Sequence, residues 1–405
     1  MQILLARTMS TAHPVHDAHG AHAIVCERLF DGWHWHEPAA LLVESGRVRA
    51  IARPAEVPDN WPKRRLPAGA LLAPGFIDLQ VNGGGGVLFN DSPTAESMRA
   101  IARAHRPFGT TACLPTMITD TRDRMRMAIA AAQGAAGRDG VIGVHLEGPF
   151  ISPGRPGIHR KDLIAQAADA DLEWLLRVAE AGRSVVTLAP ECVPAGFVRR
   201  LATAGIRVSL GHSEASARVV GHAVDEGLTG VTHLFNAMPA MAARLPGPVG
   251  AALADRRLTA SLIVDGIHVD PVAIRAAFAA KGAEGIALVT DAMPTVGATT
   301  TRFGLMGREI ALSNGSLRHA DGTLAGAHLD MASAVRNVVS LADVDLGSAL
   351  QSASLTPARF LGLDHERGAL FPGARADLVA LTPTLHPLAT WIEGLEERAS
   401  WTSPQ

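Results

Sequence analysis

Three short apolar runs of this 405-residue chain each end in a side chain that can bind a metal ion. The runs are 141–147, 208–212 and 230–233, and they end at Glu147, His212 and His233. One carboxylate and two imidazoles can hold a divalent metal and leave a position for water. Taken singly, the glutamate could form a salt bridge and the histidines could be hydrogen-bonded core residues. Their shared placement favours metal binding.

The runs also predict the fold that must position these side chains. Apolar and β-branched runs of about four to eight residues, bounded by Gly or Pro, are typical of strands buried on both faces. Five similar runs occur at 73–82, 110–116, 184–191, 260–265 and 286–291. Stretches with helical spacing lie between most of them, at 95–105, 122–133, 172–181, 215–226 and 271–281. This alternation predicts an α/β fold, a TIM-type (β/α)8 barrel, in which active-site residues lie at the C-terminal ends of strands.

The chain is longer than one barrel needs, so a second module is expected. Residues 22–72 contain short alternating segments, with a hairpin predicted around Ser45. Residues 368–405 again have β character with turn residues. We expect these two pieces to form one small, discontinuous β-sandwich domain beside a catalytic barrel at 73–367. Residues 1–21, with histidine at every third position from 13, predict a disordered tail.

Composition limits the classes of function. Hydrophobic residues make up 47% of the chain and charged residues 19%, which is typical of a globular protein. The formal charge of −2 gives no basic excess, so neither a nucleic acid nor an anionic membrane is an expected partner. Three widely separated cysteines fit a reducing cytosol, and a cytoplasmic location is expected. Neither a membrane span nor a signal peptide is predicted.

Seven motifs along the chain carry a family resemblance. They are PGFIDLQVNG (74–83), HLEGPF (145–150), LGHS (210–213), THLFNAM (232–238), DGIH (265–268), TDAM (290–293) and LAG (324–326). Together they resemble the N-acetylglucosamine-6-phosphate deacetylases of the amidohydrolase superfamily, in order from about residue 40 to about residue 382. The resemblance implies hydrolysis of an N-acetyl amino-sugar 6-phosphate to the free amine and acetate.

The resemblance also implies roles for the metal-site residues. Glu147, His212 and His233 match the metal ligands, and one divalent ion per subunit is expected, zinc in first place with iron, cobalt or manganese as alternatives. Asp291 follows the last predicted barrel strand, where an aspartate could instead cap a helix. It matches the general acid/base, which takes a proton from the attacking water and delivers it to the departing amine.

The first barrel strand favours a single metal ion. Many amidohydrolases have His-x-His there and a carboxylated lysine on strand 4, whereas this chain has Gln80 and Asn82 and no lysine in 184–191. Amides are poor ligands for zinc-like ions, and Gln80 is expected to hydrogen-bond near the metal or its water. A His-Trp-His sequence at 34–36 precedes the barrel, so we place it on the β domain and not at the metal.

Substrate contacts follow from the same resemblance. His159, in the loop after strand 3, matches a histidine that contacts the substrate near its scissile carbonyl and is expected to act in catalysis. The other expected substrate-binding residues are Asn236, Ala237, Arg244, His268, Leu324 and Ala325. Arg244 and His268 match the family's phosphate-binding cations, and Arg suits phosphate because its planar fork gives two charge-assisted hydrogen bonds. A partner subunit of a homodimer is expected to supply the phosphate-binding cations.

One departure leaves the exact substrate open. Residues 243–247 read ARLPG where relatives often show HRxPG, and 239–243 is unusually apolar. The galactosamine epimer or another N-acyl amino sugar is therefore an alternative substrate. A catalytically silent sugar-phosphate-binding protein is the alternative from a different class. An amidohydrolase that opens a cyclic amide is disfavoured, because the strand-1 histidine pair and the strand-4 lysine are both missing.

Overall fold

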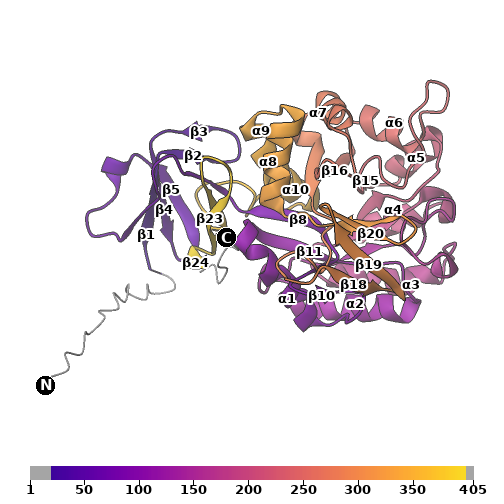
Figure 1. Cartoon of the computed structure of the whole chain (residues 1–405). Helices are drawn as coiled ribbons and strands as arrows, with labels where there is room; N and C mark the ends of the chain where they lie inside the picture. Colours follow the sequence, from indigo (N-terminus) through magenta and orange to yellow (C-terminus); the bar gives the residue numbers. More distant parts are fainter. Residues whose placement is uncertain (1–19, 398–405) are drawn as a thin grey trace, which may run out of the picture.

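The computed structural model describes residues 20–397, which form a barrel and a β-sandwich beside it (Figure 1). The barrel sheet has eight strands, all paired in parallel and in chain order. They are β8 (Phe76–Val81), β11 (Thr110–Ile118), β12 (His145–Glu147), β13 (Val185–Leu188), β14 (Arg207–Leu210), β15 (Leu228–Val231), β16 (Thr259–Ile263) and β17 (Ile286–Val289). The sheet closes on itself where Asp291 N donates to Gln80 O at 3.0 Å. The predicted TIM-type barrel is therefore confirmed.

Helices surround the barrel strands. They are α1 (Ala95–His105), α2 (Arg122–Ala135), α3 (Asp171–Leu175), α4 (Phe197–Thr203), α5 (Ala217–Asp225), α6 (Gly247–Ala254), α7 (Pro271–Gly285), α8 (Met331–Ala342), α9 (Leu346–Ala353) and α10 (Leu355–Leu361). Side-chain caps define several starts: Thr94 accepts from Ser97 N at the start of α1, and Asp330 accepts from Ser333 N at the start of α8. The predicted helix at 172–181 is only partly α-helical, because 3-10 geometry takes over at Leu176–Glu180.

An antiparallel sheet that the sequence reading did not predict is inserted between β17 and α8. Its strands are β18 (Arg302–Leu305), β19 (Arg308–Ser313), β20 (Ser316–His319) and β21 (Leu324–Ala327). Figure 1 shows β18, β19 and β20 lying across the barrel. Leu305, Ile310 and Leu317 of this sheet pack against Met293 and Ile158 from the loops of the barrel. The insert thereby forms one wall over the ends of the strands.

The β-sandwich joins segments from both ends of the chain. One sheet has the order β5-β4-β1-β6 and the other β24-β23-β22-β7-β2-β3. Their bounds are β1 (His22–Cys26), β2 (Arg28–Phe30), β3 (Trp35–His36), β4 (Ala39–Glu44), β5 (Arg47–Ala52), β6 (Lys63–Arg65), β7 (Leu71–Pro74), β22 (Leu378–Leu381), β23 (Pro387–Ile392) and β24 (Leu395–Glu397). β7 pairs antiparallel with β22, so the discontinuous sandwich is observed. Its core includes Ile24, Leu41, Leu72, Leu378 and Trp391.

The remaining sequence predictions concern the chain ends, one hairpin and the cysteines. Most of the predicted tail at 1–21, and residues 398–405, lie outside the described residues. The hairpin between β4 and β5 turns at Ser45 and Gly46, which have φ angles of 53° and 74°. The three cysteines are buried and unpaired. Within residues 20–397, the helices are all too short or too polar to cross a lipid bilayer.

Candidate metal centre and active site

The ends of four barrel strands deliver the chemically important side chains. Glu147 is the last residue of β12, and His212, His233 and Asp291 each lie two residues beyond their strands. The φ angles of these last three are 48°, 35° and 50°, in the left-handed region that side chains rarely adopt. Such backbone costs about 1–3 kcal/mol per residue and persists only where its surroundings hold it. Here His233 N donates to Ser261 Oγ at 2.7 Å, and the Asp291 amide closes the barrel.

Three donor atoms meet at this end of the barrel. His233 Nε2 lies 2.8 Å from Glu147 Oε1, and His212 Nε2 lies 3.1 Å from the same oxygen. The two imidazole nitrogens are 3.2 Å apart. Ligands bound about 2.0–2.2 Å from a tetrahedral ion lie roughly 3.3–3.6 Å from one another. The three atoms could therefore ligate one ion with small adjustments.

The protonation of His212 supports a cation at this position. Its Nδ1 lies 2.8 Å from the carbonyl oxygen of Arg155, which can only accept a hydrogen bond, so Nδ1 carries the proton. In the neutral ring, the lone pair of Nε2 then faces a carboxylate oxygen. Burial raises the pKa of Glu147, and the imidazoles of His212 and His233 hold it well below its usual value only when they are protonated and donate to the carboxylate. An ionised carboxylate facing a nitrogen lone pair is stabilised by a metal ion between them.

The second oxygen of Glu147 is held by Gln80. Gln80 Nε2 donates to Glu147 Oε2 at 3.1 Å. Both residues are buried, with 1% and 2% of their surface exposed. Gln80 therefore contacts a candidate metal ligand from behind, as an amide that orients a carboxylate. The His-Trp-His sequence lies on and just before β3 in the sandwich, and not in the barrel that carries the candidate metal ligands.

Asp291 is positioned for proton transfer. Burial and the negative charge of Glu147 raise the pKa of Asp291 to about 6. Asn82 Nδ2 donates to Asp291 Oδ1 at 2.6 Å, which stabilises the ionised form. Asn82 Oδ1 is buried and has no hydrogen-bond partner among the described residues. A carboxylate with a pKa just below neutrality is suited to accept a proton and return it.

His159 packs against His212, with their ring centroids 4.4 Å apart. Its Nε2 is 3.9 Å from Glu147 Oε2, so Glu147, His159 and His212 also form a compact group. Burial and the neighbouring His212 lower the pKa of His159 to about 3, so the ring is neutral at pH 7. The Thr119 backbone N–H points at His159 Nδ1 from 3.4 Å, and Thr119 Oγ1 lies 2.7 Å from it. Because an amide can only donate, the ring proton is placed on Nε2, which faces the candidate metal site.

A cavity of about 220 Å³ opens over these groups. Several residues expected to bind substrate line it: His159, Asn236, Ala237, His268 and Leu324. Asp265 holds His268, accepting its backbone N–H at 2.8 Å and lying 2.6 Å from its Nδ1. Thr323 and Gly326, next to Leu324 at β21, also line the cavity. The inserted sheet thus contributes directly to the candidate substrate pocket.

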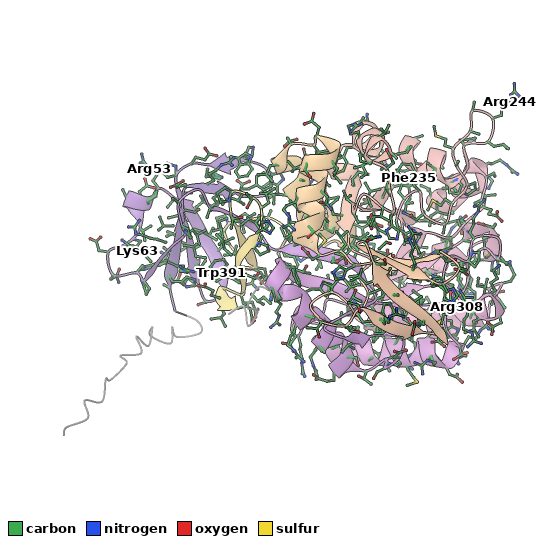
Figure 2. The ribbon with its side chains drawn as sticks, viewed as in Figure 1. Arg53, Lys63, Phe235, Arg244, Arg308 and Trp391 are labelled. Atoms are coloured by element: carbon green, nitrogen blue, oxygen red, sulfur yellow. The ribbon has the colours of Figure 1, made fainter. Side chains whose placement is uncertain are left out.

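Two residues of the expected set do not line this cavity. Arg244 is exposed at the end of a loop that projects from the barrel (Figure 2). Ala325 is fully buried in the hydrophobic cluster with Leu317 and Met293. The sequence reading, in turn, gave no role to Thr119 or Asp265. Asp265 stood within the DGIH motif, whereas Thr119 follows β11 without any local signal.

A parallel (β/α)8 barrel with a carboxylate and imidazoles at its strand ends, and an aspartate after its last strand, defines the architecture of metal-dependent hydrolases. The model of the amidohydrolase family matches residues 71–399. The chain belongs to the amidohydrolase family.

Similar proteins with assigned names indicate which branch of this family the chain resembles. An N-acetylgalactosamine-6-phosphate deacetylase of Shewanella sp. (strain ANA-3) is 42% identical over 88% of this chain and 91% of the relative. An N-acetylglucosamine-6-phosphate deacetylase of Homo sapiens is 39% identical over 82% of this chain and 84% of the relative. The crystal structure of N-acetylglucosamine-6-phosphate deacetylase from Pasteurella multocida superposes with a TM-score of 0.89 at 32% identity, covering 93% of this chain and 99% of that one. The resemblance to these deacetylases is confirmed.

Proposed function

We propose that the protein hydrolyses the N-acetyl group of N-acetylglucosamine 6-phosphate to give glucosamine 6-phosphate and acetate. The observation that carries the proposal is the meeting of Glu147, His212 and His233 within 3.2 Å, beside an aspartate whose pKa is raised to about 6. Relatives with this activity by name match most of the chain.

Glu147, His212 and His233 would hold one divalent metal ion, for which we infer zinc, with iron, cobalt or manganese as alternatives. Such an ion polarises a carbonyl oxygen and lowers the pKa of water from 15.7 towards about 7. The protein's own side chains would transfer the protons and stabilise the developing charge.

Asp291 and His159 would carry the proton chemistry. Asp291, ionised near neutral pH, takes a proton from the attacking water while the water oxygen bonds to the acetyl carbon. Negative charge then develops on the former carbonyl oxygen, where the His159 Nε2–H can donate a hydrogen bond. The C–N bond breaks as Asp291 returns its proton to the sugar nitrogen. Water and amide are consumed, and acetate and amine are formed.

The galactosamine epimer is a second candidate substrate. Two relatives named N-acetylgalactosamine-6-phosphate deacetylase are 42% and 36% identical to this chain. The epimers differ only in the orientation of one hydroxyl group, so a pocket that discriminates must bond that hydroxyl. Both sugars belong in the first assay.

We infer a homodimer in which Arg244 reaches the phosphate of the neighbouring subunit's substrate. Arg244 lies outside the cavity of its own chain, and its loop also exposes Met241 (57%) and Leu245 (76%). Such exposed apolar residues around an arginine suit a protein interface. His268, inside the cavity, is the phosphate contact we infer from the same chain.

The test measures acetate release from protein loaded with zinc. The substrates are N-acetylglucosamine 6-phosphate, N-acetylgalactosamine 6-phosphate and unphosphorylated N-acetylglucosamine. Faster release from the phosphorylated glucosamine sugar than from its epimer supports the main proposal, and the reverse order supports the second candidate. Absence of release from all three, with metal bound in stoichiometric amount, would contradict both.

A further inference from the structure

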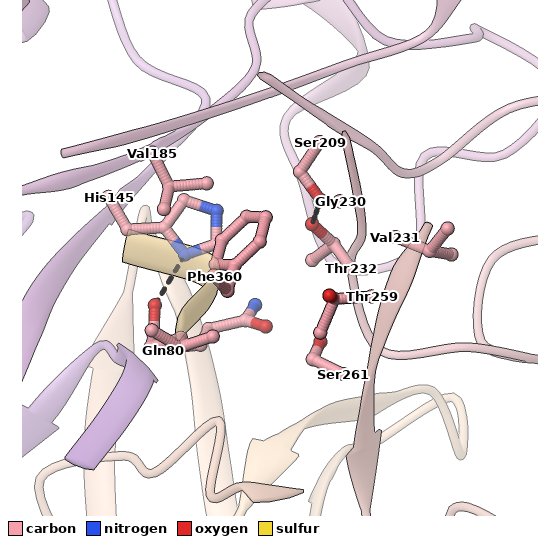
Figure 3. Close-up of a pocket in the computed structure, with 11 residues that line it drawn as sticks. Gln80, His145, Val185, Ser209, Gly230, Val231, Thr232, Thr259, Ser261 and Phe360 are labelled. Atoms are coloured by element: carbon pink, nitrogen blue, oxygen red, sulfur yellow. Dashed lines mark hydrogen bonds between the residues drawn. The ribbon is translucent and has the colours of Figure 1, made fainter. Parts of the chain in front are cut away.

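A second cavity lies inside the barrel, beneath the candidate metal ligands. Its volume is about 20 Å³, and Figure 3 shows the residues that line it. Its lining includes His145, Ser209 and Thr232, which precede Glu147, His212 and His233 by one to three residues along their strands. A site needs about 10–15 Å³ of such volume to hold one water molecule, and that water needs two to four polar partners.

A chain of hydroxyl groups along one side of this cavity has a fixed direction. His145 Nδ1 donates to Leu79 O at 2.9 Å, because a carbonyl can only accept. Its Nε2, 2.7 Å from Thr187 Oγ1, therefore accepts the Thr187 proton. Thr232 Oγ1 lies 2.6 Å from Thr187 Oγ1, and Ser209 Oγ lies 2.7 Å from Thr232 Oγ1. Each hydroxyl has one proton, so Thr232 donates to Thr187 and Ser209 donates to Thr232.

Three groups in the cavity lining then have unused hydrogen-bonding capacity. Ser209 donates its only hydroxyl proton to Thr232, so its lone pairs can still accept a hydrogen bond. Gln80 Oε1 is buried and has no hydrogen-bond partner within residues 20–397, since Nε2 of the same amide is bonded to Glu147. Ser261 Oγ accepts from His233 N at 2.7 Å, so its own proton remains to be donated. Two acceptors and one donor are the complement of a single water molecule.

We propose that one water molecule occupies this cavity, donating to Gln80 Oε1 and Ser209 Oγ and accepting from the Ser261 hydroxyl. Figure 3 shows Gln80, Ser209 and Ser261 arranged around the same space, from three different strands. By donating to Gln80 Oε1, the water stabilises the amide orientation in which Nε2 donates to the Glu147 carboxylate. It thereby connects Glu147, through Gln80, with the Ser261 hydroxyl that holds the His233 backbone.

Ser209 and Ser261 are accordingly positioning residues. Their hydroxyl groups act on the candidate metal ligands through the water and Gln80. Groups that orient metal ligands typically contribute 10- to 100-fold to metal affinity. The proposal is independent of which sugar is deacetylated, because its readouts are electron density and zinc affinity.

The experiment combines a crystal structure with zinc titration against a chelating dye. The crystal structure of the zinc-loaded protein, at a resolution that orders its other buried waters, should show one water bonded to Gln80, Ser209 and Ser261. Ser209→Ala should raise the dissociation constant of zinc about tenfold or more. Ser184→Ala is the matched control: Ser184 is equally buried, with 3% exposed, and bonds Val144 N and Ala181 O at the opposite end of the strands.

Each outcome decides the proposal. Density for the water, together with a selective loss of zinc affinity in Ser209→Ala, supports it. A cavity without density while other buried waters are ordered would overturn the water site. Equal zinc affinity of Ser209→Ala and Ser184→Ala would overturn the positioning role. If Ser209→Ala fails to fold, Ser209→Cys tests the same water, because a thiol is only a weak hydrogen-bond acceptor.

Discussion

The sequence Asp-Gly-x-His occurs twice, once in the sandwich and once at the mouth of the barrel. In the sandwich, Asp31 Oδ1 accepts the backbone N–H groups of residues 33 and 34 at 2.8 and 2.7 Å. In the barrel, Asp265 Oδ1 accepts those of residues 267 and 268, both at 2.8 Å. The glycine of each turn has a positive φ, 114° and 72°. The two turns therefore share sequence and backbone bonding.

Their surroundings differ. The side chain of His34 is 79% exposed, and its Nδ1 lies 3.8 Å from Asp31 Oδ2. The side chain of His268 is 7% exposed, and its Nδ1 lies 2.6 Å from Asp265 Oδ2. His268 lines a cavity shared by residues from the ends of most barrel strands, whereas His34 faces solvent. The same local motif becomes a candidate binding element only where the fold adds burial and converging groups.

The largest expected contrast is in metal binding. His233→Ala removes one of the three candidate ligands and should abolish stoichiometric zinc binding. Activity should fall roughly a thousandfold or more, since a metal contributes several kcal/mol to stabilising the transition state. His36→Ala, in the sandwich, should leave both unchanged, although His36 Nε2 lies 2.8 Å from Asp31 Oδ2. Metal analysis after dialysis and acetate release would measure the two effects. Loss of zinc in His36→Ala would place a metal site in the sandwich.

The next contrast separates metal binding from proton transfer within the barrel. Asp291→Asn keeps the size of the side chain but cannot take a proton from water, so kcat should fall about 10²- to 10⁴-fold. Zinc content should stay at one ion per chain, because Asp291 is not among the three donors that meet at Glu147. Single-turnover acetate release measures the loss. Activity above about a hundredth of the parent value would exclude Asp291 as the general base.

Local sequence patterns predicted the parts of this structure that depend on neighbouring residues, and missed those that depend on the fold. The barrel was predictable because buried parallel strands appear as apolar runs, and the same runs ended at Glu147, His212 and His233. The inserted sheet at 302–327 was missed, because its short amphipathic strands resemble the loops of a barrel. Thr119 was missed as well, since its bond to His159 joins residues 40 apart in the chain and only the fold brings them together.

The two Asp-Gly-x-His turns allow a matched test of phosphate binding. Asp265→Asn retains the oxygen that accepts both backbone N–H groups but removes the negative charge beside His268. An amide NH2 in place of Oδ2 cannot accept a hydrogen bond from His268 Nδ1, 2.6 Å away, so the ring is held less firmly, and KM for the phosphorylated sugar should rise about tenfold with kcat little changed. Asp31→Asn is the equivalent change in the sandwich and should alter neither constant. A proportional rise in KM for the unphosphorylated sugar would argue against a phosphate contact.

The smallest expected effect is a shift in the pH dependence. Asp291 must be ionised to accept a proton, so kcat/KM should fall tenfold per pH unit below its pKa. The hydrogen bond from Asn82 Nδ2 stabilises the ionised form and lowers that pKa. Asn82→Ala removes this bond, so the pKa rises and the acid limb moves to higher pH, by up to about one unit.

The difference between parent and variant is the measured quantity, because a bound cation lowers the pKa of Asp291 in both proteins. Profiles of kcat/KM from pH 5 to pH 8, with zinc content checked at each end, would provide it. The control substitution Asp31→Asn lies in the sandwich and should leave the acid limb where it is. An acid limb that moves to lower pH in Asn82→Ala would contradict the assignment, since loss of a donor to a carboxylate can only favour its protonated form.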